Sequence, residues 1–355
     1  MHFNPLLKWY SLHKRELPWR QTTDPYKIWL SEIILQQTRV DQGTPYYHRF
    51  LAKFPTVAHL ARARNETVFK LWQGLGYYNR AENLIATAKI IHRAYKDEFP
   101  DTYEGLLQLK GIGPYTAAAI SSIAFNRPQA VVDGNVSRVM SRLFAVSEAI
   151  DSTLGKKIIQ DLADEALNHK DPGTFNQAMM ELGARICTPR NPACESCPMA
   201  HACLAFNTGK TNHYPVKTVK QKQKERFVHF LFFWDQKHTY IYKRTDKGIW
   251  KNLYEPPFLE LNHAAKPPEI LKLIQHRKIL SAKSTRPEIK LAMEFTHHLS
   301  HQKIQACFWI IQNMSLSKTF CQQHIKLNMK QLNQYPVHRL FDKFLNSPTL
   351  QVLLK

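Results

Sequence analysis

Four of the six cysteines lie between residues 187 and 203, and this cluster constrains the fold more than any other feature of the sequence. The spacing is C-x6-C-x2-C-x5-C, through Cys187, Cys194, Cys197 and Cys203. Four cysteines at such intervals form a closed set of metal ligands, for which tetrahedral zinc is the generic interpretation. In a reducing compartment, a cluster of this kind is more typical of metal binding than of disulfide bonds. We therefore expect this part of the chain to fold around a metal centre.

A helix that follows two glycines predicts a place for an anion. In Gly111-Ile112-Gly113, which reads as a hairpin, glycine permits torsions and close approaches that a β-carbon would obstruct, and a helix of small residues begins near Tyr115. The first N–H groups of such a helix have no partners within it and lie at the positive end of the helix dipole. A phosphate of a nucleic-acid backbone can therefore bind here, in a contact that fixes position without reading a base.

An aspartate precedes the next helix. The apolar run 130–132 ends at Asp133-Gly134-Asn135, after which apolar residues recur at helical spacing. This pattern predicts that Asp133 is a helix N-cap, and for an isolated aspartate that would be its whole role. The order of hairpin, helix and aspartate, however, resembles the helix-hairpin-helix superfamily of DNA glycosylases, in which the aspartate is catalytic.

A glutamate occupies an unusual place in an earlier helix. Asp24-Pro25 predicts the start of a helix that runs to Thr38, because aspartate caps helices and proline fits the first turn. Within it, Glu32 has mostly apolar neighbours three and four residues away, whereas most helical glutamates are solvated. A carboxyl group buried without a cation has a raised pKa, so it can donate a proton near neutral pH. Glu32 is therefore the candidate general acid.

The remaining sequence before the cysteines shows helical periodicity and no alternation typical of strands. Helices are expected over residues 5–14, 45–54, 56–63, 65–73, 80–96, 153–168 and 174–184. Between two of them, Gly74-Leu75-Gly76-Tyr77-Tyr78 presents aromatic side chains on a glycine-rich loop. Such a tyrosine is either a half-buried packing residue or a wedge that enters a base stack.

The composition changes after the cysteines. Residues 207–226 are polar and rich in lysine, which predicts an extended linker that either lies along DNA or is a solvated tether. Beyond it the periodicity becomes that of strands, with a pair expected over residues 227–234 and 239–242 and another strand over 303–311. The predicted fold class is therefore multidomain, with a mainly α N-terminal domain and a second, α+β domain.

Composition favours a nucleic-acid partner. The 355 residues are enough for two domains, and 44% are hydrophobic, as in globular proteins with sizeable cores. Lys and Arg number 49 against 28 Asp and Glu, so the formal net charge of +21 favours a polyanion. The N-terminus does not read as a signal peptide, and no apolar run approaches the length of a membrane helix. We expect a cytoplasmic protein with no membrane partner.

These motifs together resemble the MutY family of adenine DNA glycosylases. The resemblance is carried by the segments 17–20 (LPWR), 29–38 (WLSEIILQQT), 74–78 (GLGYY), 111–113 (GIG), 133–136 (DGNV), 175–180 (FNQAMM) and the four cysteines. It implies a helix-hairpin-helix glycosylase domain over residues 1–206, with one 4Fe–4S cluster in the loop 187–203 in place of zinc. It also implies a Nudix-like lesion-recognition domain over residues 227–355, without the glutamate-rich metal box of a Nudix hydrolase.

The resemblance also implies a substrate and residue roles. The expected partner is duplex DNA containing adenine opposite 8-oxoguanine or guanine, bound by a monomer at the bacterial nucleoid. Glu32 would protonate N7 of adenine, ionised Asp133 would stabilise positive charge on the deoxyribose, and Tyr115 would add a hydrogen bond beside Asp133. Binding roles go to Leu17, Trp19, Arg20 and Gln177 in the adenine pocket, to Gln37 and Tyr77 at the lesion pair, and to Gly111 and Gly113 at the DNA backbone.

Two other functions are compatible with parts of the sequence. Endonuclease III, the near relative, has a lysine at the hairpin position of Tyr115, where its amine attacks the sugar and permits strand cleavage. Here the position is tyrosine and Lys110 lies before the glycines, so a monofunctional glycosylase is the better interpretation. A non-catalytic iron–sulfur DNA-binding protein would be marked by loss of Glu32 or Asp133, and both are present.

The 8-oxoguanine contact of the family has two candidates in this chain. MutY proteins use a Phe-Ser-His loop, and residues 295–301 read FTHHLSH. Leu299-Ser300-His301 fits better when aligned with the following strand, with leucine in place of phenylalanine. Phe295-Thr296-His297 is the alternative.

Overall fold

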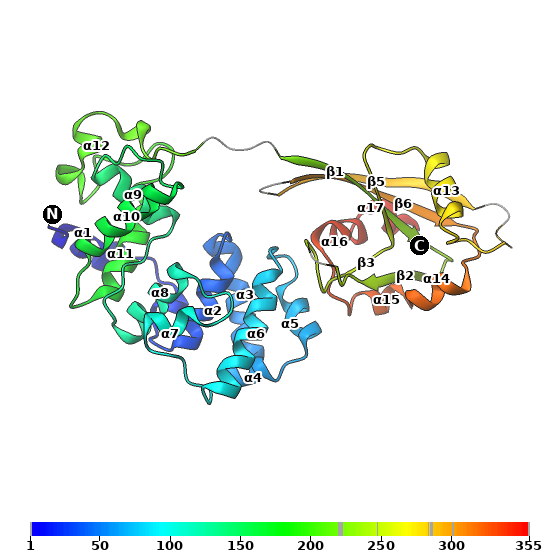
Figure 1. Ribbon diagram of the computed structural model, residues 1–355, viewed down its shortest axis with the longest axis horizontal. Helices are drawn as coiled ribbons and strands as arrows, with labels where there is room; N and C mark the ends of the chain where they lie inside the picture. Colours follow the sequence, from blue (N-terminus) through cyan, green and yellow to red (C-terminus); the bar gives the residue numbers. More distant parts are fainter. Residues whose placement is uncertain are drawn as a thin grey trace. The chain divides into compact units, whose positions relative to one another are not determined.

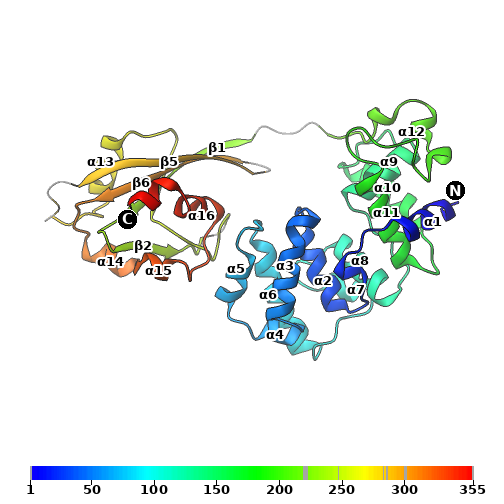
Figure 2. The ribbon, with the colours of Figure 1, turned by 180° about the vertical axis from the view of Figure 1, so that it is seen from behind.

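The computed structural model describes residues 2–218, 223–246, 248–282, 284, 287–299 and 302–353. The chain divides into two compact units, Met1–Arg62 with Glu82–Lys220 and Ala63–Ala81 with Gln221–Lys355 (Figure 1, Figure 2). The first is helical and the second contains the strands, so the predicted fold class is confirmed. None of the described helices is long and apolar enough to cross a membrane.

The first unit is built from short helices that follow one another closely. They are α1 (Asn4–His13), η1 (Pro18–Arg20), α2 (Pro25–Leu35), α3 (Val40–Lys53), α4 (Val57–Ala61), α6 (Asn79–Ala94), α7 (Tyr103–Leu107), α8 (Pro114–Phe125), α9 (Gly134–Leu143), α10 (Thr153–Ala166), α11 (Pro172–Arg185), η2 (Ala200–Ala202), α12 (Leu204–Asn207) and η3 (Thr211–His213). Helix α6 begins within the second unit.

One predicted helix start is wrong. Helix α3 begins at Val40, so Pro45 lies inside it instead of opening it. Proline lacks the N–H that would donate to the carbonyl of Asp41, four residues earlier, and the Thr44 hydroxyl beside it donates to the carbonyl of Val40 over 2.8 Å. A proline close to a helix start is therefore a weaker boundary signal than the sequence suggested.

Helices α1, α9, α10 and α11 enclose a core next to the cysteine loop. Its buried members include Leu6, Tyr10, Val136, Val139, Met140, Leu143, Ile159, Phe175, Ala178, Met179 and Leu182. On α9 and α11 these residues recur every three or four positions, the spacing that places side chains on one helix face. The packing of α9 on α11 brings the start of α9, where Asp133 lies, next to α11.

The turn Gly111-Ile112-Gly113 precedes α8 as predicted, but its two glycines differ. Gly111 has φ +78°, and an added Cβ would lie 2.5 Å from the Cβ of Asn83, so only glycine fits there. Gly113 is the N-cap of α8 with an extended backbone, and nothing lies within 4 Å of where its Cβ would be. Gly113 therefore leaves an open approach to the start of α8 and does not supply a special torsion.

The second unit is an α+β fold with two sheets. Its strands are β1 (Lys224–Phe233), β2 (His238–Lys243), β3 (Tyr254–Glu255), β4 (Phe258–Leu261), β5 (Glu288–His298), β6 (Gln302–Gln312) and β7 (Ile325–Asn328). Its helices are α5 (Asn65–Trp72), α13 (Pro267–His276), α14 (Lys318–Gln323), α15 (Met329–Leu332), α16 (Arg339–Leu345) and α17 (Pro348–Leu353). The larger sheet has the order β4-β1-β6-β5, and the smaller has β3-β2-β7.

Alternate residues of β1 pack on opposite faces of the larger sheet. Phe230 and Phe232 join a core that includes residues of α16 and α17, whereas Leu231 and Phe233 join one that includes residues of α13 and α14. In the larger sheet β1 is parallel to β6 and antiparallel to β4. Because both faces are covered, β1 is an almost unbroken apolar run and not an alternating one.

Two details of the strand region differ from expectation. The strands predicted over 227–234 and 239–242 form as β1 and β2, but they lie in different sheets and do not pair with each other. The segment 295–298 is not a loop, because it belongs to β5 and pairs with β6. Phe295 packs against the core of the larger sheet, and burial of this ring favours the strand.

Candidate active site

Glu32 lies on α2 and is only 7% exposed. The Tyr115 hydroxyl donates to its Oε2 over 2.5 Å. Burial, together with the nearby charge of Asp133, raises the pKa of Glu32 to about 7, although the Tyr115 hydrogen bond and the charge of Arg20 act to lower it. An acid with this pKa is protonated in about half of the molecules at neutral pH, so Glu32 can donate a proton there.

Tyr115 contacts Glu32 and not Asp133. The resemblance implied a hydrogen bond beside Asp133, but the packing of α8 on α2 brings the hydroxyl to Glu32 instead. The hydroxyl also lies 3.7 Å from the Sδ atom of Met180. Burial and the two carboxyl groups raise the pKa of Tyr115 well above its ordinary value. The phenol therefore stays neutral and remains a donor to Glu32.

Asp133 is the N-cap of α9, as predicted. Its Oδ1 accepts from the backbone N–H of Val136 over 2.7 Å, and its Oδ2 accepts from Nδ2 of Asn135 over 2.8 Å. Burial raises the pKa of Asp133, while these donors and Arg138 lower it. The donors and the positive end of the α9 dipole stabilise the charged carboxylate. Asp133 and Glu32 thus have unlike surroundings.

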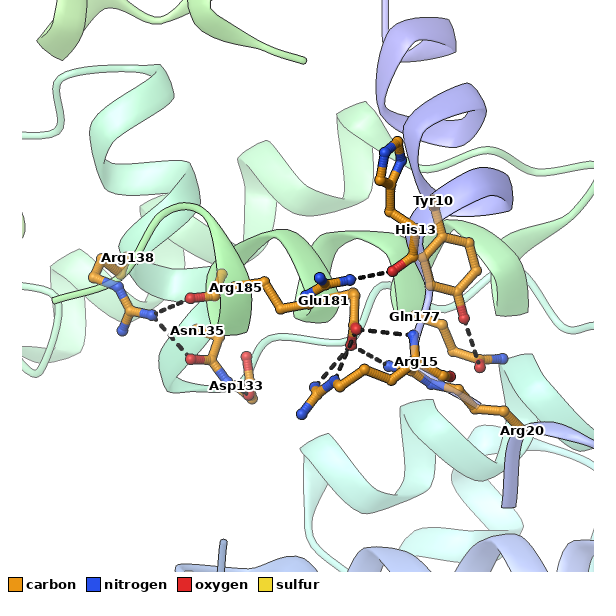
Figure 3. A network of polar contacts seen from close by, with 11 residues as sticks. Tyr10, His13, Arg15, Arg20, Asp133, Asn135, Arg138, Gln177, Glu181 and Arg185 are labelled. Carbon is orange, nitrogen blue, oxygen red and sulfur yellow. Dashed lines mark hydrogen bonds and ion pairs between the residues drawn. The ribbon is translucent and has the colours of Figure 1, made fainter. Parts of the chain in front are cut away.

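Two residues that sequence reasoning missed, Asn135 and Arg138, connect Asp133 to the cysteine loop. Figure 3 shows both of them beside Asp133. Asn135, which donates to Asp133, accepts from Nη2 of Arg138 over 2.9 Å. Arg138 also donates from Nε to the carbonyl of Cys187 over 2.7 Å. The sequence feature that could have identified Asn135 and Arg138 is their position two and five residues after Asp133, which places both polar side chains in the first turns of the helix that Asp133 caps.

Arg20 lies beside a buried carboxylate that the sequence had not singled out (Figure 3). The side chain of Glu181, on α11, is 0% exposed; its Oε2 accepts from Arg20 over 2.7 Å and from Arg15 over 2.8 Å. Burial would raise the pKa of Glu181, but the hydrogen bonds and charges of Arg15 and Arg20 outweigh it and lower the pKa to about 2. Glu181 is therefore ionised at every working pH.

Two of the residues expected in the adenine pocket, Arg20 of η1 and Gln177 of α11, both contact Tyr10. Gln177 lies one helical turn before Glu181, and its Oε1 accepts from the Tyr10 hydroxyl over 3.1 Å. The Tyr10 ring centroid also lies 5.6 Å from the guanidinium carbon of Arg20. Leu17 and Trp19, on either side of the start of η1, are each 8% exposed. Tyr10 thus contacts residues from both elements.

The two residues expected at the lesion pair share an unusual backbone. Gln37 has φ +56° and Tyr77 has φ +47°, a region that side chains other than glycine and asparagine seldom adopt. Both are exposed, Tyr77 at 50%. Such a backbone conformation costs free energy and persists only where the surrounding fold maintains it. Residues in this conformation are concentrated at binding and active sites.

The four cysteines line one cavity together with Arg142 and Leu182. Nη1 of the buried Arg142 donates to Sγ of Cys187 over 3.3 Å, a contact suited to a thiolate. Burial raises the pKa of Cys197 to about 11, so bound metal would be needed to keep this thiol ionised. Within the described part of the chain, no group of His, Cys, Asp or Glu side chains is arranged around a single ion. A cavity ringed by four sulfurs fits an iron–sulfur cluster, whose iron–thiolate bonds would tie the loop together.

Of the lesion-recognition candidates, Leu299 lies directly after β5. Its N–H donates to the carbonyl of Gln302, the first residue of β6, over 2.8 Å. Ser300 and His301 lie outside the described residues. The alternative, Phe295-Thr296-His297, is part of β5, and the Thr296 hydroxyl donates to Oε1 of Gln305 over 2.8 Å.

Comparison with known proteins agrees with this geometry. Family models match residues 30–165 (HhH-GPD superfamily base excision DNA repair protein), 187–203 (iron-sulfur binding domain of endonuclease III) and 228–347 (NUDIX domain). An adenine DNA glycosylase of Buchnera aphidicola subsp. Schizaphis graminum is 35% identical over 319 residues, which are 89% of this chain and 88% of that protein. This chain belongs to the adenine DNA glycosylase family.

Further relatives support the assignment. The human adenine DNA glycosylase is 44% identical to this chain over 209 residues, which are 56% of this chain and 38% of the human protein. Among solved structures, a thermostable thymine-DNA glycosylase matches with a TM-score of 0.54 and 31% identity, over 57% of this chain and 94% of that one. A trapped endonuclease III–DNA complex matches with a TM-score of 0.51 and 22% identity, over 58% and 94%, and shares the fold.

The family assignment establishes the reaction at a coarse level. The protein is a DNA N-glycosylase that acts on adenine in base excision repair, and it carries a 4Fe–4S cluster. The endonuclease III match at residues 187–203 favours this cluster over the zinc ion that cysteine spacing alone also allowed.

Proposed function

We propose that this adenine DNA glycosylase is monofunctional and removes adenine opposite 8-oxoguanine or guanine, acting as a monomer. The observation that carries the proposal is the pair of buried carboxyl groups with unlike surroundings. Glu32 has a pKa of about 7 and a single hydrogen bond from Tyr115, whereas Asp133 accepts hydrogen bonds from Asn135 and Val136. One group is suited to give a proton and the other to hold a negative charge.

The unlike carboxyl groups divide the chemistry between them. Glu32 donates its proton to N7 of adenine, so that the electrons of the C1′–N9 bond can leave with the base. The positive charge that develops on the deoxyribose is stabilised by the carboxylate of Asp133, or captured by it in a transient covalent bond. Water then adds at C1′ and loses a proton, which leaves an abasic site and free adenine.

The monofunctional assignment is supported by the identity of residue 115. A glycosylase/lyase needs an amine that attacks C1′ and forms a Schiff base. Here the hairpin helix presents a phenol whose pKa is raised well above its ordinary value by burial, and which donates to Glu32. The neutral phenol supports the acid and supplies no nucleophile.

Recognition of the base opposite adenine is assigned to two residues in the N-terminal part of the chain and to one segment of the C-terminal domain. Gln37 and Tyr77 are exposed and have positive φ, which suits contact with the lesion pair and insertion into the base stack. In the C-terminal domain we favour Leu299-Ser300-His301, because the competing Thr296 already donates its hydroxyl to Gln305 across the sheet.

The test is single-turnover base release from duplexes that contain adenine opposite 8-oxoguanine, guanine or thymine. We expect abasic product from the first two and none from the third, with strand breaks only after alkali. Borohydride should trap no covalent complex in good yield. Strand cleavage without alkali, together with efficient trapping, would overturn the monofunctional assignment.

A lysine variant provides the control for the lyase alternative. Lys110 is the lysine next to the hairpin, and Lys110→Ala should leave base release and the absence of strand cleavage unchanged. If cleavage is observed in the wild type and disappears in this variant, the protein is a lyase that uses Lys110. Size-exclusion chromatography with and without duplex tests the monomer.

A further inference from the structure

Glu181 is the most completely buried carboxylate of the first unit whose environment the proposed chemistry does not use. Its side chain is 0% exposed and receives hydrogen bonds from two arginines. Arg15 donates from Nε and Nη2 over 2.8 Å each and from its backbone N–H over 3.1 Å. Arg20 donates from Nη2 over 2.7 Å. Buried charges of this kind are costly unless fully paired, so their retention calls for a reason.

The arrangement around Arg20 shows that this side chain is held and still has donors to offer. Its Nη1 donates to the carbonyl of Arg15 over 3.2 Å, its Nη2 donates to Glu181, and the Tyr10 ring lies 5.6 Å away. A guanidinium group has five N–H donors, and the described residues give partners to two of them. The other donors remain for a ligand, while the side chain is only 11% exposed.

We propose that Glu181 is a positioning residue for adenine excision, which fixes the orientation of Arg20 and compensates its charge. This inference rests on the proposed placement of Arg20 in the adenine pocket. Glu181 does not touch the substrate; it acts through Arg20. Arg15 is the second cation of the site and offsets the remaining charge of the buried carboxylate, so that two arginines and one carboxylate are joined in one network (Figure 3).

The proposal has a consequence for the general acid. The charged and titratable groups that face Glu32 are Tyr115 of α8, Asp133 at the start of α9, and Arg20 of η1. The charge of Arg20 lowers the pKa of Glu32, whereas Asp133 raises it. Without Glu181, the charge of Arg20 is no longer compensated by its closest carboxylate. Glu32 should then lose its proton at a lower pH.

The experiment uses Glu181→Gln in the full-length, cluster-loaded protein. Single-turnover adenine release from an adenine:guanine duplex is measured at saturating enzyme between pH 5.5 and 9. We expect the rate at pH 7.5 to fall by about tenfold or more, and the descending limb of the pH profile to move to lower pH by about half a unit to one unit. Duplex affinity should stay within about threefold, because Glu181 does not contact DNA in this proposal.

Arg15→Gln is the matched control. It removes the other cation from the same carboxylate and leaves the Arg20–Glu181 pair. A purely structural role for Glu181 predicts that both variants lower the melting temperature and that neither moves the pH profile. Under our proposal, only Glu181→Gln moves it. An unmoved limb with a rate within threefold of wild type overturns the inference.

A double-variant cycle keeps the inference testable if Glu181→Gln folds poorly. In an Arg20→Gln background the cation through which Glu181 is proposed to act is absent. Adding Glu181→Gln to this background should therefore slow base release by less than about twofold. A further tenfold loss in this background refutes positioning through Arg20. All these rates are compared with the wild-type rate on one substrate, so the result does not depend on whether the enzyme prefers 8-oxoguanine or guanine opposite adenine. Wild-type protein that releases no adenine from any duplex would refute the proposed function instead.

Discussion

The hydrogen bond between Tyr115 and Glu32 should set the pH at which this enzyme loses activity. The bond joins the hydroxyl to Oε2 over 2.5 Å and lowers the pKa of Glu32 against the larger, opposite effect of burial. Tyr115→Phe removes the hydroxyl and keeps the ring. The carboxylate then loses a donor that stabilised its charge, so the proton is held more tightly.

The size of the shift follows from the strength of the bond. A hydrogen bond to a charged group contributes about 1.5–3 kcal/mol, and one pKa unit corresponds to about 1.4 kcal/mol. From its wild-type value of about 7, the pKa of Glu32 should therefore rise by about one to two units. The direction is opposite to that expected for Glu181→Gln.

The assay is single-turnover adenine release across the same pH range. In the wild type the rate should decline above about pH 7, where Glu32 loses its proton. In Tyr115→Phe the decline should begin one to two units higher, even if the maximal rate is lower because the acid is less well oriented. A limb that stays in place, or moves to lower pH, would show that Glu32 is not the titrating acid or that Tyr115 does not control it.

Three further predictions concern the acid, the cluster and the lesion contact. Glu32→Gln should abolish base release. Because burial raises the pKa of Glu32 in the folded protein from 4.5 to about 7, the wild type loses stability as the pH rises through this window, whereas the variant does not. Denaturant titration should show that the unfolding free energy of the wild type falls between pH 4 and pH 8 by about 3 kcal/mol more than that of the variant. Cys197→Ala should give protein without the yellow-brown cluster absorption, with a lower melting temperature and weaker duplex binding, whereas alanine at the exposed Cys321 should change none of these. Ser300→Ala with His301→Ala should reduce the preference for 8-oxoguanine over guanine by about tenfold at unchanged rate on guanine, measured by competition; if Thr296→Ala with His297→Ala removes the preference instead, the strand segment makes the contact.

The sequence by itself determined the local features of the catalytic unit. Asp24 and Asp133 each cap the helix that follows them, because a carboxylate directly before an apolar helical repeat satisfies free N–H groups. The cysteine spacing predicted the metal loop, since its ligands are close in the chain. The apolar neighbours of Glu32 predicted its burial, which is a consequence of helix geometry over one turn in each direction.

Tertiary structure decided which of these groups meet. Tyr115 and Glu32 are far apart in the chain, and only the packing of α8 on α2 directs the hydroxyl to the acid and not to Asp133. Glu181 looked like an ordinary helical glutamate, because its cations, Arg15 and Arg20, come from the opposite end of the domain sequence. Likewise, the apolar run of β1 could not reveal its sheet partners, since its parallel neighbour β6 follows much later in the chain. Local periodicity fixes which face of an element is buried, but the partner that covers this face depends on contacts distant in sequence, whose registers no local pattern encodes.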